Sequence, residues 1–134
     1  MTSPTQRSLA ALRADPRTAH VQVVEHWVSV PSMPGGGVRR DLFTVIDLVQ
    51  LEKGVSPSEC KTVGIQVCAA PSLSARQAKI EAAPALLDLW RAGWAIRVHG
   101  WRKTGPRGKR KTWACLVREI RRTADGWRWE EIAS

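Results

Sequence analysis

The sequence contains no tyrosine, only one phenylalanine and only three cysteines among its 134 residues. Cys60, Cys68 and Cys115 form no CxxC motif and no Cys/His pair at ligand spacing, which argues against a structural zinc site. We expect the three thiols to stay reduced and to pack in or near the core.

Long apolar segments are also missing. No run approaches the ~18 residues of a membrane span, and the first ten residues lack the apolar centre of a signal peptide. Hydrophobic residues make up 43% and charged residues 25%, which excludes a disordered tail, a collagen-like chain or a coiled coil. We therefore predict a single cytoplasmic domain over residues 1–134, with no membrane partner and no small-molecule cofactor.

Positive charge is what the sequence has in excess. Lysine and arginine number 21 against 12 acidic residues, a formal charge of +9. Residues 1–67 carry seven basic and six acidic side chains, whereas residues 68–134 carry fourteen and six. This asymmetry predicts a face that binds a polyanion, with nucleic acid as the expected partner. An anionic membrane or an acidic protein remains an alternative on charge alone.

The pattern of apolar residues predicts a mixed sheet with flanking helices. A helix is expected from Pro4, capped by Thr2 or Ser3 and closed at Asp15-Pro16, and a second over 74–92, which Pro84 should kink or split. Strands are expected over 20–28, 41–51, 62–68, 94–101 and 113–120, with a short one over 127–132. The predicted class is α/β in the order α-β-β-β-α-β-β.

Two polar side chains interrupt the strands expected at the centre of this sheet. Asp47 breaks the apolar pattern of 41–51, and Gln66 breaks that of 62–68. A buried carboxylate costs several kcal/mol unless it meets a cation or hydrogen-bond donors. If both strands end at one edge, Asp47, Gln66 and the Val67 carbonyl could share one Mg²⁺, which prefers oxygen ligands. An Asp that accepts hydrogen bonds from backbone amides explains the pattern as well.

Several segments together resemble one known family. They are RSLAALR, VVEHW, RRDLFTVIDLVQL, GIQVCAAPSLSARQAKI and LWRAGWAIRVHGWRK, and they cover most of residues 4–103. In order and spacing they resemble the PD-(D/E)XK nuclease superfamily, and more narrowly phage-encoded proteins related to archaeal Holliday-junction resolvases. The resemblance implies a restriction-endonuclease-like fold and a homodimer in a bacterial host. It also implies cleavage of branched or duplex DNA with Mg²⁺ or Mn²⁺.

The resemblance assigns roles to individual residues. Asp47 matches the first Asp of the motif, a metal ligand, and Gln66 stands where the family usually has Asp or Glu. Cys68 stands at the position of the family's lysine, and a thiol cannot replace an ammonium beside a scissile phosphate. Lys79 on the following helix is the candidate substitute, with Arg76 on the same helix face. A solvated surface lysine is the alternative for Lys79.

The first helix departs from the family as well. Resolvases carry a Glu there, whereas this chain has Gln6 and Arg7. Glu25, at the end of the first strand, is the candidate for the missing carboxylate, and an exposed strand-end charge is its alternative. Asp41 is a weaker candidate. With one carboxylate and a neutral Gln at the motif, we expect weak binding of a single ion.

The basic segment 102–111 (RKTGPRGKRK) contains six cations and no acid, and it is expected to form a hairpin tip between Trp101 and Trp113. Such cations contact phosphates and position a duplex without reading its sequence. Trp27 and Trp101 are the tryptophans expected to stack on bases, and the other five are expected to pack. Arg39 and Arg40 should add to the same face as this segment. The predicted nucleic-acid contacts are Arg39, Arg40, Arg76, Arg102, Lys103, Arg107, Lys109, Arg110 and Lys111.

The sequence thus predicts a Mg²⁺-dependent endonuclease. Its expected catalytic residues are Asp47, Gln66, Lys79 and Glu25, and its expected metal ligands are Asp47, Gln66 and the Val67 carbonyl. Two alternatives remain: a catalytically inactive DNA-binding module of the same fold, and a phage structural or host-interaction protein with a basic surface.

Overall fold

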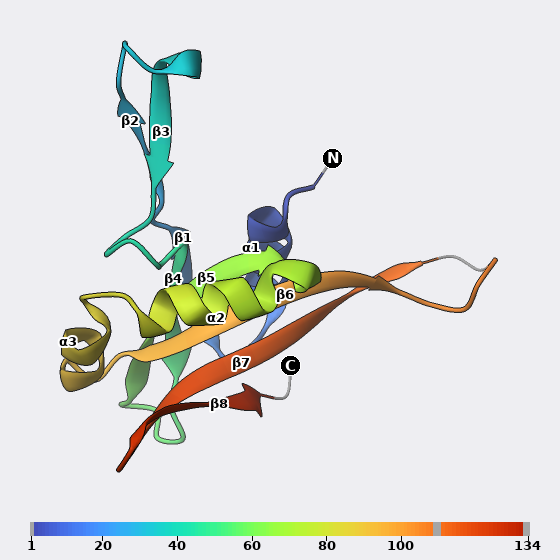
Figure 1. The fold of residues 1–134 in the computed structure, drawn as a ribbon. Coiled ribbons are helices and arrows are strands. Elements are labelled where there is room, and N and C mark those ends of the chain that lie inside the picture. The colour runs from blue at the N-terminus through green and yellow to red at the C-terminus, as the bar shows by residue number, and fades with distance from the viewer. Residues whose placement is uncertain (1, 109–110, 133–134) are drawn as a thin grey trace.

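The computed structural model describes residues 2–108 and 111–132 of the chain (Figure 1). In chain order the elements are α1 (Pro4–Ala14), β1 (Thr18–Val23), β2 (His26–Ser29), η1 (Pro34–Gly36), β3 (Gly37–Arg40), β4 (Leu48–Lys53), β5 (Cys60–Ala69), η2 (Ala70–Ser72), α2 (Leu73–Glu81), α3 (Leu86–Arg91), β6 (Ala95–Thr104), β7 (Thr112–Thr123) and β8 (Gly126–Ile132).

Six strands form one mixed sheet in the order β1-β4-β5-β6-β7-β8. Only β5 and β6 are parallel, and α2 and α3 lie in the crossover between them, as a parallel pair requires. The prediction of an α/β fold with a mixed sheet flanked by helices is confirmed. This architecture is compatible with a restriction-endonuclease-like fold.

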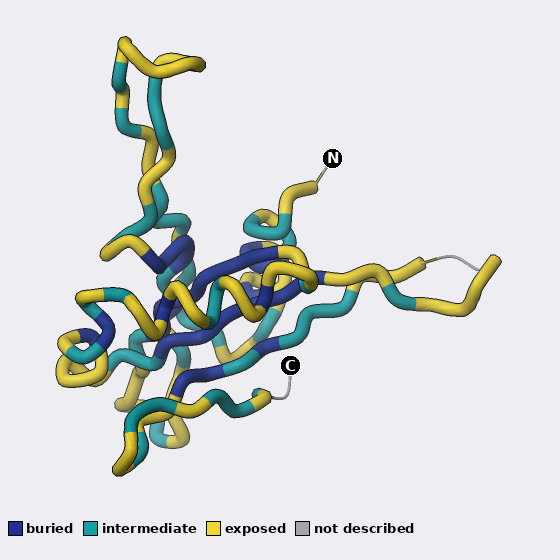
Figure 2. The backbone as a smooth tube through the Cα atoms, in the orientation of Figure 1, coloured by how far each residue is buried: buried dark blue, intermediate teal, exposed yellow. Residues whose placement is uncertain are grey.

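Helices cover both faces of the sheet. Leu9 and Leu12 of α1 pack in one apolar cluster with Val63, Ile65 and Val67 of β5. Successive residues of a strand point to opposite faces of the sheet, so the residues between these three face the other side. The second cluster, which includes residues of α2 and α3, consists of Val45, Ile46, Cys68, Leu73, Ile80, Leu86, Leu89, Ile96, Val98 and Ile120. The central strands β5 and β6 are therefore buried on both faces along much of their length (Figure 2).

The predicted helix boundaries are confirmed where local signals set them. The Ser3 hydroxyl caps α1 by accepting a hydrogen bond from the Gln6 N–H at 3.2 Å, and α1 ends just before Asp15. The second helical segment is split around Pro84, which lies between α2 and α3. Gly93, with φ of +85°, follows the end of α3.

The predicted strands over 20–28 and 41–51 are partly wrong. The first is two strands: β1 stays in the main sheet, whereas β2 pairs with β3 in a separate hairpin. In the second, β4 begins only at Leu48, because residues 42–46 form a tight turn in which Phe43 and Thr44 have positive φ. The order α-β-β-β-α-β-β is also too short, because it omits the β2–β3 hairpin and the short last strand, which was expected over 127–132 and is β8.

In the strand expected over 94–101, the sequence alternates apolar Ile96 and Val98 with polar Arg97 and His99, which predicts a half-buried strand. That prediction is wrong, because Ile96 through Trp101 are all buried. Arg97 forms ion pairs with Glu52 at 2.7 Å and Glu119 at 2.8 Å, so its charge is matched inside the fold. Because Trp101 is buried, its ring is not available to stack on a base, contrary to the expectation. Cys68 is buried and Cys115 half-buried as expected, but Cys60 is exposed.

Two hairpins leave the body of the molecule, in different directions (Figure 1). One is β2–β3, and the other is the outer part of β6–β7, where Thr104 pairs with Thr112. Both are exposed along much of their length (Figure 2). Within the described residues, no helix combines the length and apolar character needed to cross a membrane.

Candidate functional site

Three carboxylates meet where the β2–β3 hairpin joins the sheet. One oxygen from each of Glu25, Asp41 and Asp47 lies within 4.8 Å of the others. Glu25 follows β1, Asp41 follows β3 and Asp47 precedes β4, so the roots of the hairpin bring them together. They border a cleft of ≈ 430 Å³ that is lined by Ser3, Pro4, Thr5, Glu25, Arg39, Asp41, Asp47, Gln66, Val67, Cys68, Ala69, Ser72 and Arg76.

The turn over 42–46 explains why Asp41 and Asp47 are neighbours. Leu42 N–H donates to the Ile46 carbonyl at 2.9 Å, so the residues that flank this bridge lie side by side. In a continuous strand, two residues six positions apart would be separated by about 20 Å. The strand expected over 41–51 placed Asp41 far from Asp47 and left it only a weaker candidate, and the apolar anchors Val45 and Ile46 resemble those of any buried strand.

Asp47 is held rigidly at the start of β4. Its N–H donates to the Ile65 carbonyl at 2.8 Å, and its Oδ2 accepts from Gln66 Nε2 at 2.7 Å and from the Val67 N–H at 2.8 Å. The alternative explanation for Asp47 was a carboxylate that accepts hydrogen bonds from backbone amides. The bond from the Val67 N–H is of that kind, and the same carboxylate also belongs to the acidic group. Burial, together with the neighbouring Asp41 carboxyl, raises the pKa of Asp47 to about 7.

Gln66 and Val67 bring further oxygen atoms to this cleft. The Gln66 amide nitrogen contacts Asp47 and lies 3.5 Å from Asp41 Oδ2, whereas the buried Oε1 has no hydrogen-bond partner among the described residues. The N–H of Val67 points at Asp47, and in a strand the carbonyl of a residue lies on the same side as its N–H. Carboxylate, amide and carbonyl oxygens are the donor set that Mg²⁺ and Mn²⁺ prefer.

Basic side chains surround the outer two acids. Arg39 Nη1 lies 3.6 Å from Glu25 Oε1, and Lys79 Nζ lies 3.3 Å from Asp41 Oδ2. Glu25 is thus mostly shielded and paired with Arg39, and Lys79 reaches the acidic group although its side chain is 41% exposed. Arg76 lines the cleft itself.

Cys68 also lines the cleft, at the position where the resemblance expects a lysine. Burial raises the pKa of its thiol, and this effect outweighs the Arg76 guanidinium, which acts in the opposite direction. The thiol is therefore neutral and adds no charge to the cleft. Any cation at this position has to come from Arg76 or Lys79.

The predicted basic hairpin is the arm formed by the ends of β6 and β7. Arg102, Lys103, Arg107 and Lys111 are exposed on it, and Lys111 Nζ donates to the Gly105 carbonyl at 2.9 Å. Lys109 and Arg110 lie outside the described residues. Arg39 and Arg40, which were expected to add to the same face, belong to the separate β2–β3 hairpin.

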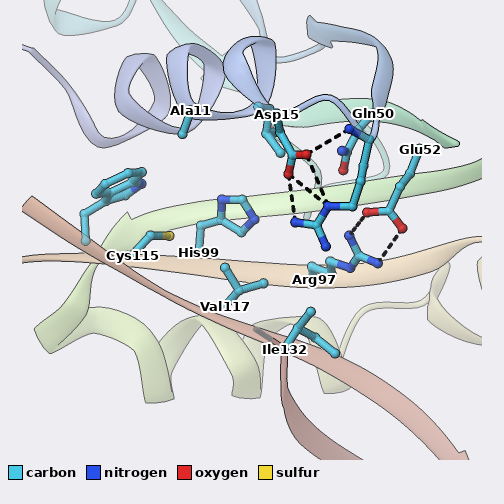
Figure 3. A pocket seen from close by; sticks show the side chains of 12 residues that line it. Ala11, Asp15, Gln50, Glu52, Arg97, His99, Cys115, Val117 and Ile132 are labelled. Atoms are coloured by element: carbon cyan, nitrogen blue, oxygen red, sulfur yellow. Dashed lines mark hydrogen bonds and ion pairs between the residues drawn. The ribbon is translucent and has the colours of Figure 1, made fainter. Parts of the chain in front are cut away.

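A second pocket, of ≈ 190 Å³, opens beside the end of α1 (Figure 3). Two of its lining residues, His99 and Trp101, bond the buried Ser8: Trp101 Nε1 donates to Ser8 Oγ at 2.8 Å, and Ser8 Oγ lies 2.9 Å from His99 Nδ1. Because the indole only donates, the Ser8 hydroxyl donates to His99, whose pKa burial lowers to about 4. This network was missed because polar residues at alternate positions of a strand normally indicate a solvent face.

The charges around this second pocket are matched to one another. Arg97 is paired with Glu52 (Figure 3), and Arg17 is paired with Asp15 at 2.8 Å. These charges pair with one another, so the acidic cleft is the stronger candidate site. In comparison with known proteins, the chain matches no family model, no curated protein and no solved structure.

Proposed function

We propose that the chain is a Mg²⁺- or Mn²⁺-dependent endonuclease that hydrolyses phosphodiester bonds in structured DNA, branched or duplex. The observation that carries this proposal is the meeting of Glu25, Asp41 and Asp47 around the unpartnered oxygen of Gln66. Three carboxylates at this spacing repel one another, and burial together with the Asp41 carboxyl raises the pKa of Asp47 to about 7. A divalent cation relieves that repulsion.

The residues of the cleft divide the work of hydrolysis. Asp47, Asp41 and Glu25, with the oxygens of Gln66 and Val67, would hold the ion. A bound divalent ion polarises the phosphate and lowers the pKa of a coordinated water, which supplies the nucleophile. Lys79 and Arg76, the remaining cations nearby, would neutralise the charge that develops on the phosphate oxygens; Arg39 lies at the rim beside Glu25.

The two exposed hairpins support a nucleic-acid substrate. The β6–β7 arm displays Arg102, Lys103, Arg107 and Lys111, and residues 102–111 contain no acidic side chain. Contacts from such cations to phosphates hold DNA without selecting a sequence.

Symmetric cleavage of a junction needs two sites, so the proposal includes a homodimer. Light scattering of the protein, with and without a four-way junction, tests this oligomeric state.

The decisive experiment incubates the protein with four-way-junction, duplex and single-stranded DNA, with and without Mg²⁺ or Mn²⁺. We expect metal-dependent cutting that Asp47→Asn abolishes. Asp88→Asn is the matched control, because Asp88 is an exposed carboxylate on α3 whose partner is Arg91. Cutting that persists in Asp47→Asn would overturn the proposed site.

Lys79→Ala should slow cutting by roughly 10²-fold, by analogy with the loss of one charge-stabilising donor. Normal cutting by this variant would refute the role of Lys79 and leave the rest of the proposed site in place.

A DNA-binding module without catalysis is the second candidate. The neutral Cys68 at the usual lysine position favours it. Salt-sensitive binding without cutting, for any of the metals and DNA forms, would support this module over the nuclease. A complete lack of binding at low salt would overturn both and favour the host-interaction protein with a basic surface.

A further inference from the structure

The β2–β3 hairpin presents an aromatic ring beside the acidic cleft. Trp27 is 57% exposed, the largest fraction for any tryptophan in the described part of the chain. Together with Glu25 and Arg39 it lines a hollow of ≈ 430 Å³. This hollow shares Ser3, Thr5, Glu25 and Arg39 with the acidic cleft, so the two are adjoining parts of one surface.

The ring is positioned by the backbone of the opposite strand. A Cβ atom added to Gly37 would lie 2.6 Å from Trp27 Cε2 and 2.7 Å from Cζ2, so the indole packs directly against this glycine. One side of the ring is thereby in contact with β3, while more than half of the residue stays open to solvent. An aromatic ring held in this way loses little further freedom when a second flat group stacks on it.

The neighbours of the ring have the charge that a nucleotide requires. Arg39 is the cross-strand partner of Trp27, and its side chain is 73% exposed. Arg40, also exposed, pairs with His26 one position along. An open indole next to a mostly exposed guanidinium, whose one ionic contact among the described residues is with Glu25 at 3.6 Å, matches a base and its phosphate, because bases stack on aromatic rings and phosphates pair with arginine.

A base inside a continuous duplex cannot use this ring without first leaving the stack, which costs free energy. We propose that Trp27 and Arg39 form a stacking site for an unpaired nucleotide near the scissile phosphate. The preferred substrate class is then DNA with a single-stranded segment at a branch or flap rather than continuous duplex. This inference rests on the proposed function, whose cleft it adjoins.

The test measures binding in EDTA, where cutting does not interfere. The probes are a flap that carries 2-aminopurine in its single-stranded segment and a fully paired duplex of the same length. Trp27→Leu keeps an apolar side chain over Gly37 but removes the aromatic face, and Trp27→Phe keeps that face. Trp90→Leu is the control, since Trp90 is exposed on α3 and lines neither the hollow nor the cleft.

We expect quenching of 2-aminopurine by the unmodified protein, Trp27→Phe and Trp90→Leu. Trp27→Leu should lose the quenching and bind the flap about tenfold more weakly, with duplex affinity unchanged. Equal flap affinity and equal quenching for Trp27→Leu and the unmodified protein would overturn the stacking site, whether or not the protein cuts DNA. Quenching that depends on Trp27 in a protein that never cuts would overturn the nuclease and leave the stacking site in place.

Discussion

Gln66 Nε2 donates a hydrogen bond to Asp47 Oδ2 over 2.7 Å, so the two polar residues that interrupt the apolar pattern are direct partners. The bond commits the amide nitrogen and leaves the amide oxygen as the free group of Gln66. A neutral amide here also limits the negative charge of the cleft to three carboxylates. The balance between repulsion and cation binding therefore depends on this residue.

Replacing Gln66 by Glu adds a fourth carboxylate to the cleft. We expect Gln66→Glu to bind Mn²⁺ roughly tenfold more tightly, since affinity for hard cations rises with the number of charged ligands. Without metal the same variant should unfold at lower urea concentration, because the added charge is buried beside Asp47. Isothermal titration calorimetry and urea denaturation in EDTA measure the two effects.

Gln77→Glu is the matched control for this substitution. It adds the same charge on α2, where Gln77 accepts a hydrogen bond from Arg118 at 2.7 Å, away from the cleft lining. Its Mn²⁺ affinity should equal that of the unmodified protein. An unchanged or weakened Mn²⁺ affinity in Gln66→Glu would contradict the assignment of this side chain as a ligand.

The pH dependence of stability should contain two opposing contributions. The pKa of Asp47 rises from 3.8 to about 7 on folding, so the folded state holds a proton that the unfolded state has lost. Its contribution to stability therefore falls as the pH rises from about 4 to about 7. The pKa of His99 falls from 6.5 to about 4, so its contribution is lost as the pH falls through that same interval.

Asp47→Asn separates these contributions. The free energy of unfolding of the variant, minus that of the unmodified protein, should increase from pH 4 to pH 7 and then level off. Urea denaturation in EDTA at each pH gives this difference. Parallel curves for the two proteins would show that the Asp47 carboxyl is not protonated in the folded state. At pH 8, added Mg²⁺ should stabilise the unmodified protein and not the variant.

Removing charge from the β6–β7 arm should change how DNA affinity depends on salt. The triple variant Arg102→Gln, Lys103→Gln and Arg107→Gln loses three exposed cations. Each phosphate contact contributes about 0.9 to the slope of log affinity against log salt, so we expect the slope to decrease by roughly 2 to 3. Fluorescence anisotropy with a labelled duplex at several salt concentrations measures the slope.

The control for this variant removes the same charge elsewhere. Arg13, Arg91 and Arg128 are exposed on α1, α3 and β8, and their joint replacement by Gln also lowers the net charge by three. This control should leave the salt slope nearly unchanged. Equal slopes for the two triple variants would mean that net charge, and not the arm, attracts DNA.

Ser8 is fully buried between α1 and β6, where it bonds both His99 and Trp101. Ser8→Ala leaves one donor and one acceptor without a partner in the interior, so we expect a loss of ~1–3 kcal/mol in the free energy of unfolding. Ser74→Ala, at an exposed position of α2, should change it by less than ~0.5 kcal/mol. Equal urea midpoints for the two variants would contradict the role of Ser8.

Local chemistry explains which features could be predicted from the sequence. The capping Ser3, the break at Pro84 and the hairpin around 102–111 depend on residues that are close in the chain. The pairing of Asp47 with Gln66 was also within reach, because each is an interruption in a strong apolar strand pattern.

Features that depend on distant partners were not predicted. Arg97 and His99 look like solvent-facing residues until Glu52, Glu119 and Ser8 are brought beside them. The tight turn before Asp47 consists of residues with ordinary strand preferences, and positive φ at Phe43 has no strong sequence signal.

The sequence by itself determined the excess of positive charge, the apolar strands and the polar residues that interrupt them. These properties belong to single residues and their neighbours in the chain. Only the tertiary structure decided that Glu25, Asp41 and Asp47 share one cleft and that Trp27 stands open beside it. Their closeness depends on one hairpin that leaves the sheet and one turn that brings the chain back, and burial of Val45 and Ile46 stabilises that return.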